Sequence, residues 1–333
     1  MKYVELARLL ADGQFRSGEY LGEKLGISRA AVWKQVTHLR NRGIDVHAVK
    51  GKGYRFAKPI ELLNDTLIYQ ALSEQSRQCI DQFEVFSEID STNQYLLKQI
   101  FLQQKKSYVC LAEYQNKGKG RRGRQWISPY ASNIYLSVLW RFKANLGTLE
   151  GLSLIVAIAV AEALCSMGLR DVKVKWPNDV IYHGRKLAGI LLETAGDFSA
   201  PAQVVIGVGL NVDMPKTPSL QIDQPWTDIA ACSSVKISRN VIGAALIQSL
   251  MVTLTEYEQN GFENYRARWE ALDYIKGKII DISFQEGVLQ GMAQGVDKRG
   301  ALLVKTTQGI QAFHSGEVSL RLAKDQLPQN TIE

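Results

Sequence analysis

Apolar residues in the first sixty positions recur with the spacing of short amphipathic helices. One helix is predicted over residues 4–10 and a second from about Ser17 to Gly26. Ser28 is a good N-cap for a third helix over residues 29–42. The residues expected to face inward from the second helix are Tyr20, Leu21 and Leu25. The apolar stripe of the third helix consists of Val32, Val36 and Leu39.

Two short extended runs follow, at residues 44–49 and 54–56, and a basic, glycine-rich segment joins them. A hairpin after a helix-turn-helix is typical of a winged-helix domain, whose third helix enters the major groove of DNA while lysines contact phosphates. We therefore predict that DNA is bound by the hairpin and by the third helix. The residues expected to contact DNA are Ser28, Arg29, Trp33, Lys34, Gln35, His38, Lys50 and Lys52. A helical bundle used for protein contacts is the alternative.

The net charge of the chain is concentrated in this same segment. Residues 1–60 contain 12 lysines and arginines against 5 acidic residues, so they carry the whole formal charge of +7. A small unit with such an excess is typical of proteins that bind a phosphate backbone. A solvated basic surface would have the same composition, and it is the helical pattern that favours DNA.

Beyond residue 60, β-branched and aromatic runs alternate with helical segments, which predicts an α+β domain built on a central sheet. Strands are predicted at residues 83–89, 108–114, 133–140, 172–176, 180–182, 188–193 and 204–212. Helices are predicted at residues 93–101, 151–167 and 240–260. The apolar run at residues 151–161 is far shorter than the ~20 residues of a membrane span, so it predicts a buried helix and no membrane segment. A proline-rich loop is predicted at residues 213–226.

From Lys278 onward, short strands separated by glycine turns predict a small β-barrel. The expected turn glycines are Gly287, Gly291, Gly300, Gly309 and Gly316. Together with a boundary near Pro59, this pattern predicts three domains, at residues 1–60, 61–272 and 273–325.

The four cysteines are scattered and show no metal-ligand spacing. They are Cys79, Cys110, Cys165 and Cys232. The first residues also lack the basic-then-apolar layout of a secretion signal. We therefore expect a cytoplasmic protein with free thiols.

Residues 118–124, Gly-Lys-Gly-Arg-Arg-Gly-Arg, match the G-x-G-x-x-G pattern of dinucleotide-binding folds. The context excludes that fold, because a strand and not a helix follows the glycines. What the segment does offer is four cations within six positions, which could close over a polyanion with guanidinium groups meeting phosphate or carboxylate oxygens. An ordinary surface loop, or a second contact to nucleic acid, would have the same residues.

Three further segments combine polar groups at strand ends. Lys175-Trp176-Pro177-Asn178-Asp179 presents an amide and a carboxylate together, which suits a hydrated Mg²⁺ or nucleotide phosphates, although an Asx turn would also explain it. Lys186 enters a strand predicted to be buried, where an ammonium group requires an anionic partner. Asp90-Ser91-Thr92-Asn93 joins a strand to a helix, and helix capping alone would explain its hydroxyl groups.

In combination these segments resemble the motifs of biotin–protein ligases, in that family's order, across about residues 85–215. They are S-T-N before a helix, E-Y-Q running into G-K-G-R-R-G, K-W-P-N-D, R-K-L-A-G-I-L and G-V-G-L-N. The N-terminal winged helix and the C-terminal barrel narrow the resemblance to the bifunctional type, which also represses biotin synthesis. The resemblance covers essentially the whole chain, and it implies a class II synthetase-like catalytic domain and an SH3-like barrel.

Proteins of this family activate biotin with Mg-ATP as biotinyl-5′-AMP and then transfer it to a lysine of the biotin carboxyl carrier protein. Bringing a carboxylate to a triphosphate sets like charges against each other, so catalysis needs cations and positioning more than a nucleophile. The resemblance assigns catalysis to Lys186, Arg121 and Asp179, and the metal ion to Asp179. It assigns biotin binding to Ser91, Thr92, Asn93, Gln115, Lys119, Gly120, Arg121 and Lys186. It assigns adenylate binding to Arg122, Gly123, Asn178, Gly209, Asn211 and Trp226.

One position departs from the family pattern, because the second residue of the glycine loop, usually arginine, is Lys119. The charge is kept but the planar fork is lost, so we expect intact activity and an altered hold of the loop on the adenylate. For regulation, the resemblance implies that the bound adenylate is a corepressor. It would promote a homodimer and place two winged helices on a palindromic operator.

Three alternatives remain. A transcription factor that senses its ligand without turning it over would not require the whole set of ligase motifs. A lipoate ligase shares the core fold but would not explain G-K-G-R-R-G or the N-terminal domain. A ligase whose winged helix has lost operator recognition is disfavoured by the basic hairpin.

Overall fold

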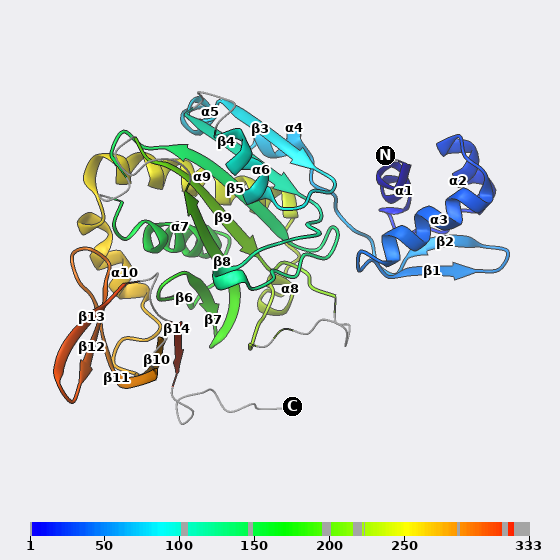
Figure 1. The fold of residues 1–333 in the computed structure, drawn as a ribbon. Helices are drawn as coiled ribbons and strands as arrows, with labels where there is room; N and C mark the ends of the chain where they lie inside the picture. Colours follow the sequence, from blue (N-terminus) through cyan, green and yellow to red (C-terminus); the bar gives the residue numbers. More distant parts are fainter. Residues whose placement is uncertain are drawn as a thin grey trace.

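The computed structural model describes residues 2–100, 106–145, 149–194, 201–215, 222, 224–284, 287–314 and 319–322. The N-terminal helices and hairpin form a unit at one side of the molecule, a large sheet lies in the middle, and the C-terminal strands lie at the far end (Figure 1). This arrangement confirms the predicted α+β fold with an N-terminal helix-turn-helix.

The N-terminal unit has the predicted elements. They are α1 (Lys2–Leu10), α2 (Gly18–Leu25), α3 (Arg29–Arg40), β1 (Val46–Val49) and β2 (Gly53–Phe56). The Ser17 and Ser28 hydroxyls accept hydrogen bonds from the third backbone N–H beyond each of them, and Gly26 ends α2 in the left-handed conformation at φ 62°. Val32, Val36 and Leu39 are fully buried, as predicted.

Two details of this unit differ from the sequence prediction. Tyr20 is 38% exposed and lies on the outer face of α2, within reach of the cations of Arg16 and Lys24. The third helix ends at Arg40, two residues earlier than predicted, because the last residues before Gly43 form a turn.

The winged-helix unit is held against the central domain by a polar cluster centred on Glu88. Arg42 donates from Nε at 2.9 Å and from Nη2 at 2.5 Å to this carboxylate, and the Tyr3 hydroxyl donates at 2.9 Å. Burial acts to raise the pKa of Glu88, but these hydrogen bonds outweigh it and lower the pKa below its usual value. His38 also lies here, with Nε2 3.7 Å from Glu88 and its ring against Tyr3.

The central sheet has seven strands in the order β3-β4-β5-β9-β8-β7-β6, of which only β3 and β4 are parallel neighbours. The strands are β3 (Gln82–Phe86), β4 (Ser107–Ala112), β5 (Ile134–Arg141), β6 (Val172–Lys175), β7 (Asp179–Tyr182), β8 (Arg185–Thr194) and β9 (Gln203–Leu210). All seven predicted strands are present, with ends that differ by at most three residues. The described residues 213–215, 222 and 224–226 of the predicted proline-rich loop lie outside any helix or strand, and its remaining positions are outside the described residues.

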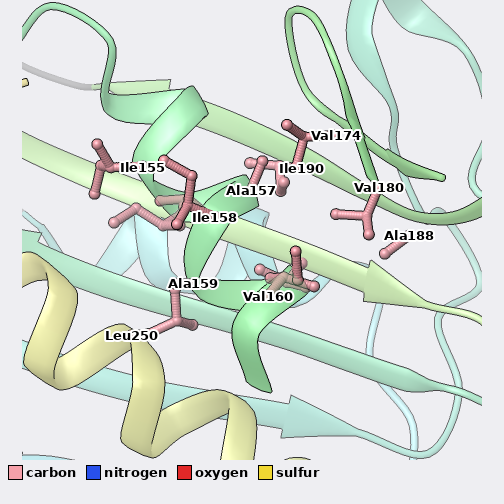
Figure 2. Packing of buried hydrophobic residues seen from close by; sticks show 14 of the residues in the cluster. Ile155, Ala157, Ile158, Ala159, Val160, Val174, Val180, Ala188, Ile190 and Leu250 are labelled. Atoms are coloured by element: carbon pink, nitrogen blue, oxygen red, sulfur yellow. The ribbon is translucent and has the colours of Figure 1, made fainter. Parts of the chain in front are cut away.

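One face of this sheet is covered by α7 (Leu152–Ser166) and α9 (Arg239–Asn260). Figure 2 shows Ile155, Ile158 and Val160 of α7 packed among strand residues, with Leu250 of α9 beside Ala159. The predicted buried helix is therefore confirmed. Among the described residues, no helix is long and apolar enough to span a membrane.

The remaining helices are short and lie around the sheet. They are α4 (Asp65–Gln70), α5 (Glu74–Gln78), α6 (Thr92–Gln99), α8 (Ile229–Cys232) and α10 (Arg266–Leu272), with 3₁₀ turns at Arg121–Gly123 and Glu263–Tyr265. Only α6 was predicted, because the others are too short to show a full helical period. α6 packs on the face of the sheet opposite to α7.

The C-terminal unit is a five-stranded antiparallel sheet in the order β13-β12-β11-β10-β14. Its strands are β10 (Ile279–Phe284), β11 (Gly287–Val296), β12 (Leu302–Thr306), β13 (Gly309–Phe313) and β14 (Ser319–Leu322). Gly300 turns the chain at φ 81°, but Gly291 lies inside β11, where a side chain would meet Val304, so its assignment to a turn was wrong. Gly316 lies outside the described residues.

Candidate functional site

The central cleft opens on the face of the sheet that α7 and α9 leave uncovered. Strand alternation decides which side chains reach it, because on β9 Ile206 and Val208 point to the helices while Gly207 and Gly209 point to the cleft. The cleft has a volume of about 1190 Å³. Of the predicted biotin, adenylate and catalytic residues, all but Gly123 line it.

The two cleft-facing glycines of β9 leave room for particular side chains. A Cβ at Gly207 would collide with the amide of Asn93, and a Cβ at Gly209 would collide with the indole ring of Trp126. Gly189 of β8 is paired with Gly209 in the sheet register, and a Cβ there would lie 2.9 Å from the same ring. The glycines of this region are therefore required for close approach of side chains to the sheet.

The S-T-N segment forms the inner wall of the cleft, at the start of α6. Ser91 caps the helix, as expected, and Thr92 N–H donates to Gln115 Oε1 at 2.9 Å. Gln115 Nε2 donates to Ser128 Oγ at 3.3 Å, and the Ser128 hydroxyl in turn donates to Trp126 O at 3.0 Å. These contacts hold the Gln115 amide in one orientation.

The centre of the cleft holds an ion pair between Lys186 and Asp179. Their Nζ and Oδ1 atoms are 2.8 Å apart, and the side chains are only 15% and 19% exposed. Lys186 Nζ also lies 5.4 Å from the centre of the Trp126 ring. The expectation that a buried lysine on β8 needs an anionic partner is confirmed, and that partner is the predicted metal-binding carboxylate.

The glycine loop brings cations toward this pair. Arg121 Nη1 donates to Asn178 Oδ1 at 3.2 Å, while Asn178 Nδ2 donates to the Ile190 carbonyl at 2.6 Å. Burial, together with the nearby charge of Arg122, lowers the pKa of Arg121. Lys119 and Gly123 are exposed at the outer part of the loop.

A second partly buried cation, Lys175, lies beside the pair. Burial lowers the pKa of Lys175 at the end of β6, while Asp179 opposes that effect and Lys186 adds to it. Within the described residues there is no cluster of three or more His, Cys, Asp or Glu side chains that could hold a metal ion by itself. The polar content of the site is thus dominated by positive charge, which suits an anionic substrate better than a resident cation.

The predicted adenylate residues form the other wall. Trp226 is bridged to Lys186 in a short parallel pairing, with Lys186 N–H donating to the Pro225 carbonyl at 2.9 Å. Asn211 is 5% exposed, and its Nδ2 donates to the Thr227 carbonyl at 3.1 Å. Asn211 therefore ties the end of β9 to the segment that carries Trp226.

Several cleft residues were missed by reasoning from the sequence. These residues lie within or beside the cleft: Trp126, Ser128, Ser137 and Lys175. Lys175 belongs to the K-W-P-N-D segment but had no assigned role, and the other three look like ordinary strand or loop residues in the sequence. Strand alternation could have found Ser137, because it places a hydroxyl between Leu136 and Val138 within a predicted strand.

The predicted DNA-contacting residues fall into two groups. Arg29, Lys34, Lys50 and Lys52 are exposed, and Trp33 is 55% exposed, while Gln35 is half-buried and Ser28 caps α3. His38 differs, since it lies in the Glu88 cluster between the winged-helix unit and the central domain. We therefore remove His38 from the predicted DNA surface.

Three family descriptions match separate parts of the chain. Residues 4–55 match an HTH domain, residues 85–211 match the biotin/lipoate A/B protein ligase family, and residues 277–321 match the biotin protein ligase C-terminal domain. The three matches follow the order of the three structural units.

Proteins similar in sequence match this chain over nearly its full length. The bifunctional ligase/repressor BirA of Escherichia coli is 42% identical over 321 residues, which cover 96% of this chain and 98% of the relative. The protein of the same name from Bacillus spizizenii is 29% identical over 315 residues, which cover 93% of this chain and 95% of the relative. A biotin protein ligase from Aquifex aeolicus, solved in complex with biotin and ATP, superposes with a TM-score of 0.64 at 26% identity and covers 73% of this chain and 100% of its own.

Proposed function

Because this chain belongs to the biotin–protein ligase family, in its bifunctional ligase/repressor form, we propose that it activates biotin with ATP and transfers it to a carrier protein. The acceptor is a lysine of the biotin carboxyl carrier protein. Domain limits at residues 1–60, 61–272 and 273–325 belong to the same proposal.

The observation that carries this proposal is the meeting of four elements in one cleft. Thr92 comes from α6, Gln115 from the segment after β4, Asp179 from β7 and Lys186 from β8. Polar groups suited to a neutral ring thus lie on the inner wall, and a partly buried cation lies at the centre of the cleft. A ligand with an uncharged polar head and a carboxylate tail, such as biotin, matches that division.

In the proposed reaction the biotin carboxylate attacks the α-phosphate of ATP, which releases pyrophosphate and gives biotinyl-5′-AMP. Lys186 would neutralise the carboxylate while the two anions approach, and Arg121 would bind oxygens of the adenylate. The Lys186–Asp179 pair keeps the ammonium inside the cleft before substrate arrives. The carrier lysine then attacks the mixed anhydride, and AMP leaves.

Mg²⁺ enters this proposal as part of the nucleotide substrate. One carboxylate, Asp179, with the neighbouring Asn178 amide, fits an ion that keeps most of its ligands from phosphates and water. Asp179 would hold the ion against the triphosphate, and removal of free Mg²⁺ by a chelator would stop adenylation.

The test is to incubate the purified protein with ATP, Mg²⁺, biotin and a biotin carrier domain and to measure the mass of the carrier. We expect a gain of one biotinyl group that disappears in Lys186→Ala and Arg121→Ala proteins. No gain with a competent carrier would contradict the ligase, and biotin-dependent ATP–pyrophosphate exchange would then distinguish a ligand sensor from a ligase. Supplying lipoate instead of biotin tests the remaining ligase alternative.

For the N-terminal unit we propose operator binding, with biotinyl-5′-AMP as corepressor and a homodimer as the binding form. The proposed DNA surface consists of Ser28, Arg29, Trp33, Lys34, Gln35, Lys50 and Lys52. Exposed cations on α3 and on the β1–β2 turn support this surface. A Lys50→Ala/Lys52→Ala protein should bind operator DNA more weakly, with a smaller salt slope and unchanged ligase activity.

A further inference from the structure

A chain of four oxygen atoms runs along the inner wall of the cleft. Ser137 Oγ lies 2.6 Å from Asn93 Oδ1 and 2.6 Å from Thr92 Oγ1, and Thr92 Oγ1 lies 3.1 Å from Gln115 Oε1. Ser137 is fully buried, and Thr92 and Asn93 are 3% and 4% exposed. The contacts therefore lie away from bulk water, where unmade hydrogen bonds are costly.

This chain has three contacts and only two protons. Amide oxygens carry none, and the Ser137 and Thr92 hydroxyls carry one each. One contact must therefore lack a proton, and which contact it is depends on the direction in which both hydroxyls point.

That direction is determined at the far end by Glu193, a residue of β8 that lies outside the cleft lining. Asn93 Nδ2 donates to Glu193 Oε2 at 2.8 Å and to the Leu191 carbonyl at 3.3 Å. Both partners only accept, so the amide nitrogen faces them and Asn93 Oδ1 faces Ser137. Within the described residues, Ser137 is the only donor to that oxygen.

The register of the sheet makes this arrangement possible. Ser137 on β5 and Leu191 on β8 are both paired with Gly207 of β9, so the three residues form one row across the cleft face. The Asn93 amide lies over the glycine of that row, where a Cβ would collide with it. Asn93 can therefore reach partners on β5 and β8 at once.

If Ser137 donates to Asn93, the Thr92 hydroxyl can donate either to Ser137 Oγ at 2.6 Å or to Gln115 Oε1 at 3.1 Å. Two hydroxyl oxygens only 2.6 Å apart repel each other unless a proton lies between them, so Thr92 donates to Ser137 and no proton lies between Thr92 Oγ1 and Gln115 Oε1. Gln115 Oε1 still accepts from Thr92 N–H at 2.9 Å, so no buried acceptor is left unsatisfied. The opposite direction would leave Asn93 Oδ1 without a donor, at a cost of roughly 1–3 kcal/mol for a buried group. The first direction is favoured, and it leaves two acceptor oxygens facing the cleft together.

We propose that Ser137 and Glu193 are positioning residues that direct this proton order, so that Thr92 and Gln115 present a pair of acceptors to a ureido N–H of biotin. The inference rests on the proposed function and explains selectivity for a ring with N–H donors. The dithiolane ring of lipoate has no N–H, and the acceptor pair would stay unpaired against it.

The first experiment measures the dissociation constant for biotin by calorimetry, together with the KM values for biotin and ATP in biotin-dependent ATP–pyrophosphate exchange. Ser137→Ala frees the Thr92 hydroxyl to turn toward Gln115, and we expect biotin to bind about 10-fold more weakly with the KM for ATP unchanged. Glu193→Lys presents a donor in place of an acceptor to Asn93, and it should raise the dissociation constant for biotin by about 5-fold. Glu193→Gln, which can still accept from Asn93, should stay within about 2-fold.

Thr194→Ala is the matched control, because Thr194 is exposed and next to Glu193 on the same strand. It should match the wild type in both KM values. Equal losses in Glu193→Gln and Glu193→Lys, or parallel losses for biotin and ATP, would indicate a merely structural role and overturn the proposal.

The second experiment uses two isomeric biotin carbamates, in which a ring oxygen replaces one or the other ureido N–H. One isomer should bind the wild-type protein about 10-fold more weakly than the other, and Ser137→Ala should reduce that ratio to near one. An unchanged ratio in Ser137→Ala would overturn the proton order while leaving the ligase intact. A wild-type protein that binds neither biotin nor its analogues would instead contradict the proposed function.

Discussion

The two faces of the central sheet are made from the same strands but have opposite properties. On β5 and β9 the residues that face α7 and α9 include Leu136, Val138, Ile206 and Val208, all at most 2% exposed. On the cleft face the same two strands present a hydroxyl at position 137 and glycines at positions 207 and 209. Neighbouring residues on one strand thus serve either stability or ligand binding.

This difference shows how the fold tolerates a polar, cationic cleft. The apolar face packs continuously with two helices and supplies most of the burial that stabilises the domain (Figure 2). The cleft face then needs no large side chains, and its glycines let Asn93 and Trp126 approach the backbone. Substitutions on the two faces should therefore change different measurements.

The largest effect is expected at the ion pair of the cleft. Lys186→Met removes the cation that opposes the charge of the substrates, and we expect kcat/KM for biotin-dependent exchange to fall by about 10²–10³-fold. It also leaves Asp179 buried without its partner, so the thermal midpoint should fall. Adding Asp179→Asn should restore the midpoint but not the activity, whereas recovery of activity would contradict the role of Lys186.

A smaller but still large loss of activity is expected from Gly209→Ala. The new Cβ would displace the Trp126 ring from the cleft floor, and exchange activity should fall by roughly 10–100-fold. Gly243→Ala on α9 is the control, because its Cβ would meet only ordinary contacts at 3.6 Å. Equal activities of the two variants would show that the close approach at Gly209 is not needed.

Val208→Ala should lower stability and leave activity intact, although Val208 adjoins Gly209 in the chain. The loss of two buried methyl groups from the helix-facing side should lower the free energy of unfolding by about 2 kcal/mol, as measured by urea titration. Activity of the folded protein should stay within about 2-fold. A large loss of activity at unchanged stability would break the distinction between the faces.

The smallest effect is expected at the exposed edge of the cleft. Lys119→Arg restores a planar fork to the glycine loop, and we expect the adenylate to dissociate roughly 3-fold more slowly with kcat unchanged. Stopped-flow displacement of biotinyl-5′-AMP measures this rate, and an unchanged rate would contradict a role for position 119 in holding the adenylate.

Local patterns in the sequence were enough to predict much of this protein. Helical spacing and serine caps determined α2 and α3, runs of β-branched residues determined all seven strands of the central sheet, and the buried character of α7 followed from its apolar length. Motif order identified the family and, through it, the residues that line the cleft. These features depend on a few consecutive residues, so no distant contact was needed to infer them.

The tertiary structure alone decided which distant groups meet. The pairing of Lys186 with Asp179 and the row formed by Ser137, Gly207 and Leu191 depend on strand order and register. The placement of His38 against Glu88 depends on how two domains dock, and a helical pattern shows only that a residue lies off the apolar stripe, without showing what covers it. Proton order and domain contact are properties of groups far apart in the chain, so they arise only when the chain is folded.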